Sequence, residues 1–333
     1  MIVINKAILH ILDFNTGMTA FSDELLQPIG GIEEFLCKHI EKSIASQEAK
    51  PGIFYEDSEC KKLLIAYLSD EMEFVPFSKE IAHIFEQALS HAEEMVSADL
   101  VICDLCIEEK RKIAIFKCNS HMGFVHQITQ TAAGTKNDII DHYAILPNLT
   151  QKIEEFAFID AQTMDISLLA KKYTIDGNSI FILPEILLEC AQKPSPKETI
   201  KKISQTVKQV AEAYGQDNVA AAAAMKTYIA ENMEISPQLD PQEAGKAVFR
   251  DNPAMQAEYN QQLQDAGFTE PVAMDQESTL KKMRNHKLKT DTGIELTIPT
   301  DYFENTEFVE FNRNEDGSLS ITLKHIQNIM NRG

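Results

Sequence analysis

The sequence contains no apolar run that approaches the roughly 20 residues a helix needs to cross a bilayer, so we expect no helical membrane span. Its first twelve residues are apolar, but they lack a basic leader and a small-residue cleavage site and therefore predict a strand, not a signal peptide. The six cysteines are too few and too scattered for a secreted disulfide scaffold. We therefore expect a soluble, cytoplasmic protein with reduced thiols and no contact with membranes.

Basic residues are also scarce, because 31 Lys and Arg stand against 51 Asp and Glu, for a formal net charge of −20. Affinity for duplex DNA depends largely on Lys and Arg that displace condensed counterions. The balance therefore excludes a protein that coats DNA over its whole surface, and any contact with DNA must be local. The charge is unevenly spread, since residues 1–193 carry 16 basic and 30 acidic side chains whereas residues 271–333 carry 8 and 10.

The sequence shows no catalytic constellation, so we expect a protein without enzyme activity and without a cofactor. Gly30 and Gly31 precede a predicted helix, but no Lys-Ser/Thr pair follows them as a phosphate-binding loop requires. Asp138, Asp141 and His142 lie close together without a matching nucleophile or a second group of ligands. This pattern predicts the polar side of a strand.

One spacing superficially matches a four-ligand zinc site: Cys103, Cys106, Cys118 and His121. Strand geometry argues against the site, because residues 103 and 106 are an odd number apart and would face opposite sides of a sheet. One metal could reach both thiols only if a bulge intervened. We therefore predict buried free thiols and no metal.

Length and pattern predict an α+β protein with two or three domains. Lys193-Pro-Ser-Pro196 marks one expected boundary and Glu270-Pro271 marks another. The predicted parts are an α+β domain with a mixed sheet over residues 1–193, a helical segment over 194–270 and a small β-rich unit over 271–333.

Apolar periodicity predicts the individual elements of these three parts. In the first part, helices are expected at 32–44, 58–68, 76–95 and around 184–191, and strands at 2–12, 99–107, 112–118, 124–129, 139–146 and 155–159. The middle part is expected to contain helices at 196–214, 217–232, 241–250 and 253–266. In the last part we expect a strand at 294–298 and a hairpin at 307–323, whose Asp316-Gly317 turn accommodates positive φ.

The positive charge of the last part is concentrated in a stretch of nine residues that we call the basic run. Its five basic residues are Lys281, Lys282, Arg284, Lys287 and Lys289. Ser278 or Thr279 can cap a short helix that holds the first three, and the helix N-terminus would add amide donors for an anion. Basic side chains at this spacing can follow a phosphate backbone, and the scarcity of aromatic residues indicates little sequence specificity. The alternative is a solvated β-edge kept soluble by lysines.

The same stretch resembles the bacterial 37-kDa nucleoid-associated protein family. The resemblance is sharpest at Thr279–Pro299 and Asp316–Ile326, softer at Ile113–Phe116, Ile145–Pro147 and Lys171–Gly177, and weaker over nearly the whole chain. It implies a bacterial protein of the nucleoid that binds DNA or a nucleoid protein. In one hypothesis the basic run binds DNA weakly, with a possible homodimer doubling the phosphate contacts. In the other, the chain is an acidic adaptor recruited to the nucleoid by a basic protein partner.

Overall fold

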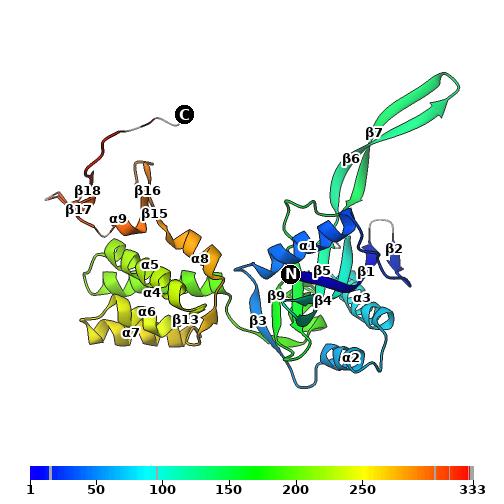
Figure 1. The fold of residues 1–333 in the computed structure, drawn as a ribbon, viewed down its shortest axis with the longest axis horizontal. Coiled ribbons are helices and arrows are strands. Elements are labelled where there is room, and N and C mark those ends of the chain that lie inside the picture. The colour runs from blue at the N-terminus through cyan, green and yellow to red at the C-terminus, as the bar shows by residue number, and fades with distance from the viewer. Residues whose placement is uncertain (15–16, 95–96, 304, 315, 329, 331–333) are drawn as a thin grey trace. The chain divides into compact units, whose positions relative to one another are not determined.

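The computed structural model of the chain describes residues 1–14, 17–94, 97–303, 305–314, 316–328 and 330. The chain divides into two compact units, Met1–Lys193 and Pro194–Gly333. It is an α+β protein with one large antiparallel sheet and several helices, so the predicted fold class is confirmed (Figure 1). A further division of the second unit near residue 271 stays a prediction. Within the described residues, every helix is too short or too polar to span a bilayer.

The first unit is built around an eight-stranded antiparallel sheet of order β12-β3-β9-β8-β5-β4-β1-β2. The strands are β1 (Ile2–Asp13), β2 (Met18–Phe21), β3 (Lys50–Phe54), β4 (Ala98–Ile107), β5 (Lys110–Asn119), β8 (Glu155–Asp160), β9 (Ile166–Leu169) and β12 (Cys190–Gln192). The predicted hairpin of β4 and β5 lies inside the sheet. Its turn consists of Glu108 and Glu109, both at positive φ, as the twist of a two-residue hairpin turn requires.

Helices cover both faces of this sheet because each carries one apolar stripe. Helix α1 (Gly31–Ile44) packs Leu36 and Ile40 against one face, whereas α2 (Glu59–Leu68) and α3 (Phe74–Ser90) pack against the other. The expected helix around 184–191 is confirmed only in its first half. The chain forms a π-helical turn η1 (Ile182–Leu187), and β12 then pairs with β3 after a positive φ at Glu189.

The predicted strands at 124–129 and 139–146 pair with each other as a two-stranded ribbon that we call the arm. It consists of β6 (His121–Thr131) and β7 (Gly134–Ile145), and it extends away from the eight-stranded sheet in Figure 1. A second small hairpin joins β10 (Tyr173–Ile175) to β11 (Asn178–Ile180). The prediction that Asp138, Asp141 and His142 form the polar side of a strand is only partly right, because all three lie on β7 but its alternation places Asp138 and Asp141 on opposite faces. Asp138 forms an exposed ion pair with Lys136 at 2.6 Å.

The cysteines of the apparent zinc spacing lie on different sides of β4. Cys103 and Cys118 are buried in the core beneath α1, whereas Cys106 lies on the opposite face, with its Sγ 3.7 Å from Asn5 Nδ2. Burial raises the pKa of the Cys103 and Cys118 thiols to about 12. The predicted opposite orientation of Cys103 and Cys106 is confirmed, and the absence of a bound metal stays a prediction.

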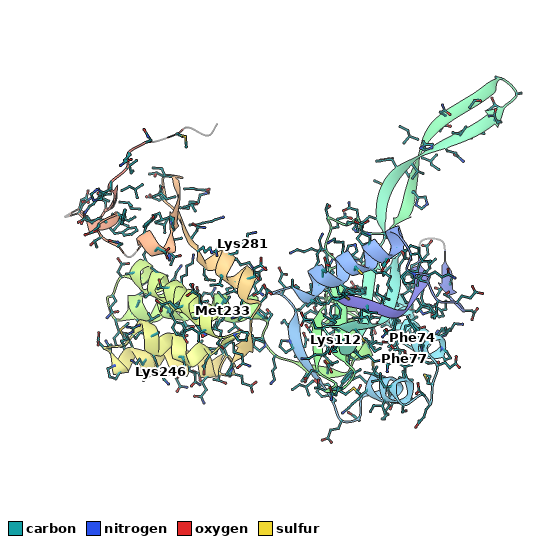
Figure 2. The ribbon with its side chains drawn as sticks, viewed as in Figure 1. Phe74, Phe77, Lys112, Met233, Lys246 and Lys281 are labelled. Carbon is teal, nitrogen blue, oxygen red and sulfur yellow. The ribbon has the colours of Figure 1, made fainter. Side chains whose placement is uncertain are left out.

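The second unit begins with the predicted helices, each started by a capping side chain. They are α4 (Pro196–Ala213), α5 (Asn218–Ile235), α6 (Pro241–Val248) and α7 (Pro253–Asp265), capped by Ser195, Asp217, Asp240 and Asn252. A short pair, β13 (Gln238–Leu239) and β14 (Val272–Ala273), joins the helices to α8 (Gln276–Met283). Their apolar faces form one core that includes Met233, labelled in Figure 2, and Met283.

Helices α6 and α7 pack closely at Gly245. Gly245 of α6 is buried, and a Cβ built on it would lie 2.2 Å from Cδ1 of Tyr259. Tyr259 is fully buried on α7 and donates its hydroxyl proton to the carbonyl oxygen of Pro241 at 2.8 Å. The aromatic ring therefore occupies the space that any larger residue at position 245 would need.

Two hairpins and a short helix complete the second unit. The hairpins are β15 (Asn285–Lys289) with β16 (Glu295–Pro299) and β17 (Val309–Arg313) with β18 (Leu319–Leu323), and α9 (Thr300–Phe303) lies between them. They share a small core in which Ile298, Phe303 and Val309 pack with Ala223 of α5. This core attaches the β15–β16 hairpin to the helices.

Candidate nucleic-acid interface

The basic run occupies the last turn of α8 and all of β15. Lys281 and Lys282 lie in that last turn, Arg284 is the C-cap residue, and Lys287 and Lys289 lie on β15. All five side chains are exposed. Figure 2 marks Lys281 on α8. The structure therefore exposes all five predicted side chains along residues 281–289.

The expected cap of α8 at Ser278 or Thr279 is wrong. Asp275 caps the helix by accepting the backbone N–H of Ser278 at 2.8 Å, and Thr279 is fully buried one turn later. Lys281 and Lys282 therefore lie at the C-terminal end of α8, where the helix dipole favours positive charge. The free amides of the helix lie at its other end, so only side chains of the run are available to an anion there.

The strand part of the run divides its residues between two faces. Lys287 and Lys289 are exposed, whereas His286 is buried and Leu288 is partly buried against the small core under the hairpin. The hairpin pairs Lys287 with Thr297 and Lys289 with Glu295. The apolar face thus holds the strand in place while the opposite face carries the positive charge.

Carboxylates near the run reduce its positive electrostatic potential. Glu295 Oε1 lies 3.1 Å from Lys289 Nζ, and both side chains are about 70% exposed, at 70% and 72%. Glu277 and Asp291 lie in α8 and in the hairpin loop. Within the described residues, no carboxylate lies within 4.0 Å of the other four basic groups. Lys289 is therefore the weakest of the five candidates.

A further lysine, Lys226, lies next to the run, and nothing in the sequence pointed to it. Lys226 of α5 donates from Nζ to the carbonyl oxygen of Asn285 at 3.2 Å and so ties the start of β15 to the helices. Burial lowers the pKa of Lys226, and the charges of Lys208 on α4 and Lys287 lower it further. Sequence reasoning could not find this lysine, because the packing of separate elements brings it beside the run.

The sequence matches the family model of nucleoid-associated protein YejK, known as NA37, over residues 8–331. The chain belongs to the NA37 family. The match covers nearly the whole chain and spans both units, so the resemblance that the sequence suggested is confirmed. A comparison with curated proteins finds no significant match. Nucleoid association is thus the functional class of the family, and the mode of association is open to proposal.

In this NA37 chain, His286 belongs to the hydrophobic support of the run and adds no positive charge to it. Its ring is 5% exposed and stacks on Phe303, with 4.0 Å between the ring centroids. Burial, assisted by the charge of Lys226, lowers the pKa of His286 from 6.5 to about 4. The imidazole is therefore neutral at pH 7.

Protonation of His286 is expected to destabilise the hairpin of this NA37 protein in mild acid. An unfolded histidine takes up its proton near pH 6.5, whereas the folded one resists protonation down to about pH 4. The contribution of the neutral His286 to the free energy of unfolding is therefore fully present above pH 6.5, and it is lost as the pH falls toward 4. A His286→Phe variant keeps the ring stack but cannot be protonated. We expect the difference in melting temperature, variant minus wild type, to increase as the pH falls from 7 to 4.5.

Taking the difference in melting temperature between variant and wild type cancels the effects of the other titrating groups. These include the buried His10, whose pKa is also lowered to about 4. A melting-temperature difference that stays constant over this pH range would contradict a buried neutral imidazole at position 286.

Proposed function

We propose that this NA37 protein binds duplex DNA weakly and with little sequence preference through Lys281, Lys282, Arg284, Lys287 and Lys289. The observation that carries the proposal is the exposure of all five side chains on one stretch of an otherwise strongly acidic chain. Lysine and arginine at such a site meet phosphate oxygens and release counterions, and these contacts are independent of base sequence. Lys226 adds positive potential beside the run.

Two features support phosphate contacts over contacts with bases. The ring within residues 281–289, that of His286, is buried against Phe303, so the run itself offers no exposed aromatic surface for base stacking. The nearby Glu277, Asp291 and Glu295 repel a polyanion and keep the affinity low. Weak, salt-sensitive binding is the behaviour that this arrangement supports.

A fluorescence titration of the wild-type protein with a short duplex at about 50 and 200 mM salt tests the proposal. Five phosphates neutralised on duplex DNA correspond to a log–log slope of roughly −4 to −5. Over that fourfold change in salt, the dissociation constant should rise by a factor of roughly 250–1,000. A duplex of unrelated sequence should behave alike.

The second candidate function is that of an acidic adaptor, and the net charge of −20 favours it. In this case a basic nucleoid protein binds the carboxylate-rich surface, and DNA is contacted only through that partner. The same titration separates the two functions. The adaptor would show no measurable affinity for DNA at 50 mM salt but would bind a basic protein in a salt-sensitive manner.

A further inference from the structure

The arm carries large apolar side chains that nothing in the described structure covers. Residues paired directly across an antiparallel ribbon share one face. The register therefore places Phe124 (paired with Asp141), Ile139 (paired with His126) and Ile128 (paired with Asn137) on the same face. Their exposed fractions are 67%, 79% and 62%. We call this side of the ribbon the apolar face of the arm.

Two of the three charged side chains of the arm lie on the opposite face, which also carries Val125 and Ile140. Lys136 pairs with Thr129 and Asp138 pairs with Gln127, and both pairs lie on the other side of the ribbon. On the apolar face, the charged residue is Asp141, near the base of the arm. From there to the tip the face presents only uncharged positions and His126. In a chain of net charge −20, this is a strip on which another acidic molecule can lie without meeting carboxylates along most of its length.

A two-stranded ribbon standing alone in water is only marginally stable, and it usually needs a further strand or a helix to cover an apolar face. Groove binding to DNA does not fit the arm, because its one lysine, Lys136, is outnumbered by Asp138 and Asp141. The required partner must instead offer an uncharged apolar surface of similar length.

We infer that the apolar face of the arm binds the same face of a second copy of this chain. The pattern is self-complementary, as a two-fold interface requires. The His126–Ile139 pair lies at its centre, with Phe124 two residues toward the base and Ile128 two residues toward the tip. A two-fold axis across the ribbon at this pair brings Phe124 of one copy against Ile128 of the other, and Ile139 against itself.

This arrangement is antiparallel, so the two acidic bodies lie at opposite ends of the overlap, where their repulsion is smallest. Eleven residues per strand give a length of about 36 Å, and two strands about 5 Å apart give each face about 350 Å². Two such faces together bury less than the roughly 1,000 Å² of a stable interface. The dimer is therefore reversible, and its population depends on protein concentration. The inference goes beyond the proposed function and does not depend on DNA binding.

Sedimentation equilibrium of the full chain over a wide concentration range tests the inference. The wild type should pass from monomer to dimer with rising concentration. Ile139→Lys places two ammonium groups together at the two-fold axis and should raise the dissociation constant at least tenfold. Thr129→Lys is the matched control, because it adds the same charge to an exposed position on the opposite face, and it should leave the dissociation constant unchanged.

A wild type that stays monomeric at high concentration overturns the inference, as does equal weakening by both variants. A proximity measurement supports the result independently of stability. Ile139→Cys should form a dimer with a short bis-maleimide, above the background from the six native cysteines, whereas Thr129→Cys should not. A protein that does not dimerise through the arm could still bind DNA with the expected salt dependence. The two proposals can therefore be refuted independently.

Discussion

Replacing Lys281, Lys282 and Arg284 together with glutamine is expected to weaken binding to all duplex sequences alike and to flatten the salt dependence. Each phosphate contact contributes about 0.9 to the slope of log affinity against log salt, so three lost contacts should reduce it by about 2–3. At about 100 mM salt we expect the affinity to fall on the order of 100-fold. The measurement is a titration of labelled duplex at several salt concentrations.

The chain offers a control with the same change in net charge. Lys38, Lys62 and Lys246 are exposed, and each forms an i, i+3 ion pair with a glutamate outside the basic run. Their triple glutamine variant also removes three positive charges, but it should keep a slope near that of the wild type. Both variants should melt close to the wild type, because exposed charges contribute little to stability. Equal losses of affinity in the two variants would show that overall charge, and not the run, governs binding.

Gly245→Ala is expected to cause the largest loss of stability from a single methyl group in the second unit. The added Cβ would lie 2.2 and 2.4 Å from two carbons of the Tyr259 ring. That ring cannot move away easily, because it is fully buried and its hydroxyl is bonded to Pro241. Overpacking of a rigid core typically costs about 1–3 kcal/mol, and we expect the upper part of that range. Chemical denaturation monitored by far-UV circular dichroism measures the change.

Two further variants assign the loss to the Tyr259 ring. Gly31→Ala places the same methyl in the first turn of α1, where no atom lies within 4 Å, and should be neutral or slightly stabilising. In a Tyr259→Leu background, Gly245→Ala should lose most of its cost, since the ring atoms it would strike are gone. A cost that persists in that background would mean that the backbone, and not the ring, excludes the methyl group.

The sequence predicted those parts of the fold that local pattern determines. Helices α4 to α7 follow from their capping residues and apolar spacing, and the hairpin of β4 and β5 follows from two apolar runs around a charged turn. The region around Glu189 was mispredicted as helix because pairing with β3, a tertiary contact, decides its conformation. The arm shows the same limit. Its strands were predicted, but their separation from the main sheet depends on which edges meet.

In the candidate site, too, local features could be predicted from the sequence, whereas features that depend on tertiary packing could not. Exposure of the five basic side chains could be anticipated, since charged residues in a polar stretch rarely bury. Asp275 was missed as the cap of α8 because Ser278 and Thr279, three and four residues later, are also good capping residues. Lys226 was missed because its position beside Asn285 depends on how α5 packs against the hairpin.

The alternation along β15 has a consequence for how this surface can diverge between related proteins. His286 and Leu288 hold the strand from inside, while Lys287 and Lys289 project outward and take no part in the core. A lysine codon becomes a glutamate codon by one nucleotide change, which at either outward position would reverse a charge and leave the core unaltered. Evolution can therefore adjust the charge of this surface in small, independent steps while the hairpin beneath it keeps its shape.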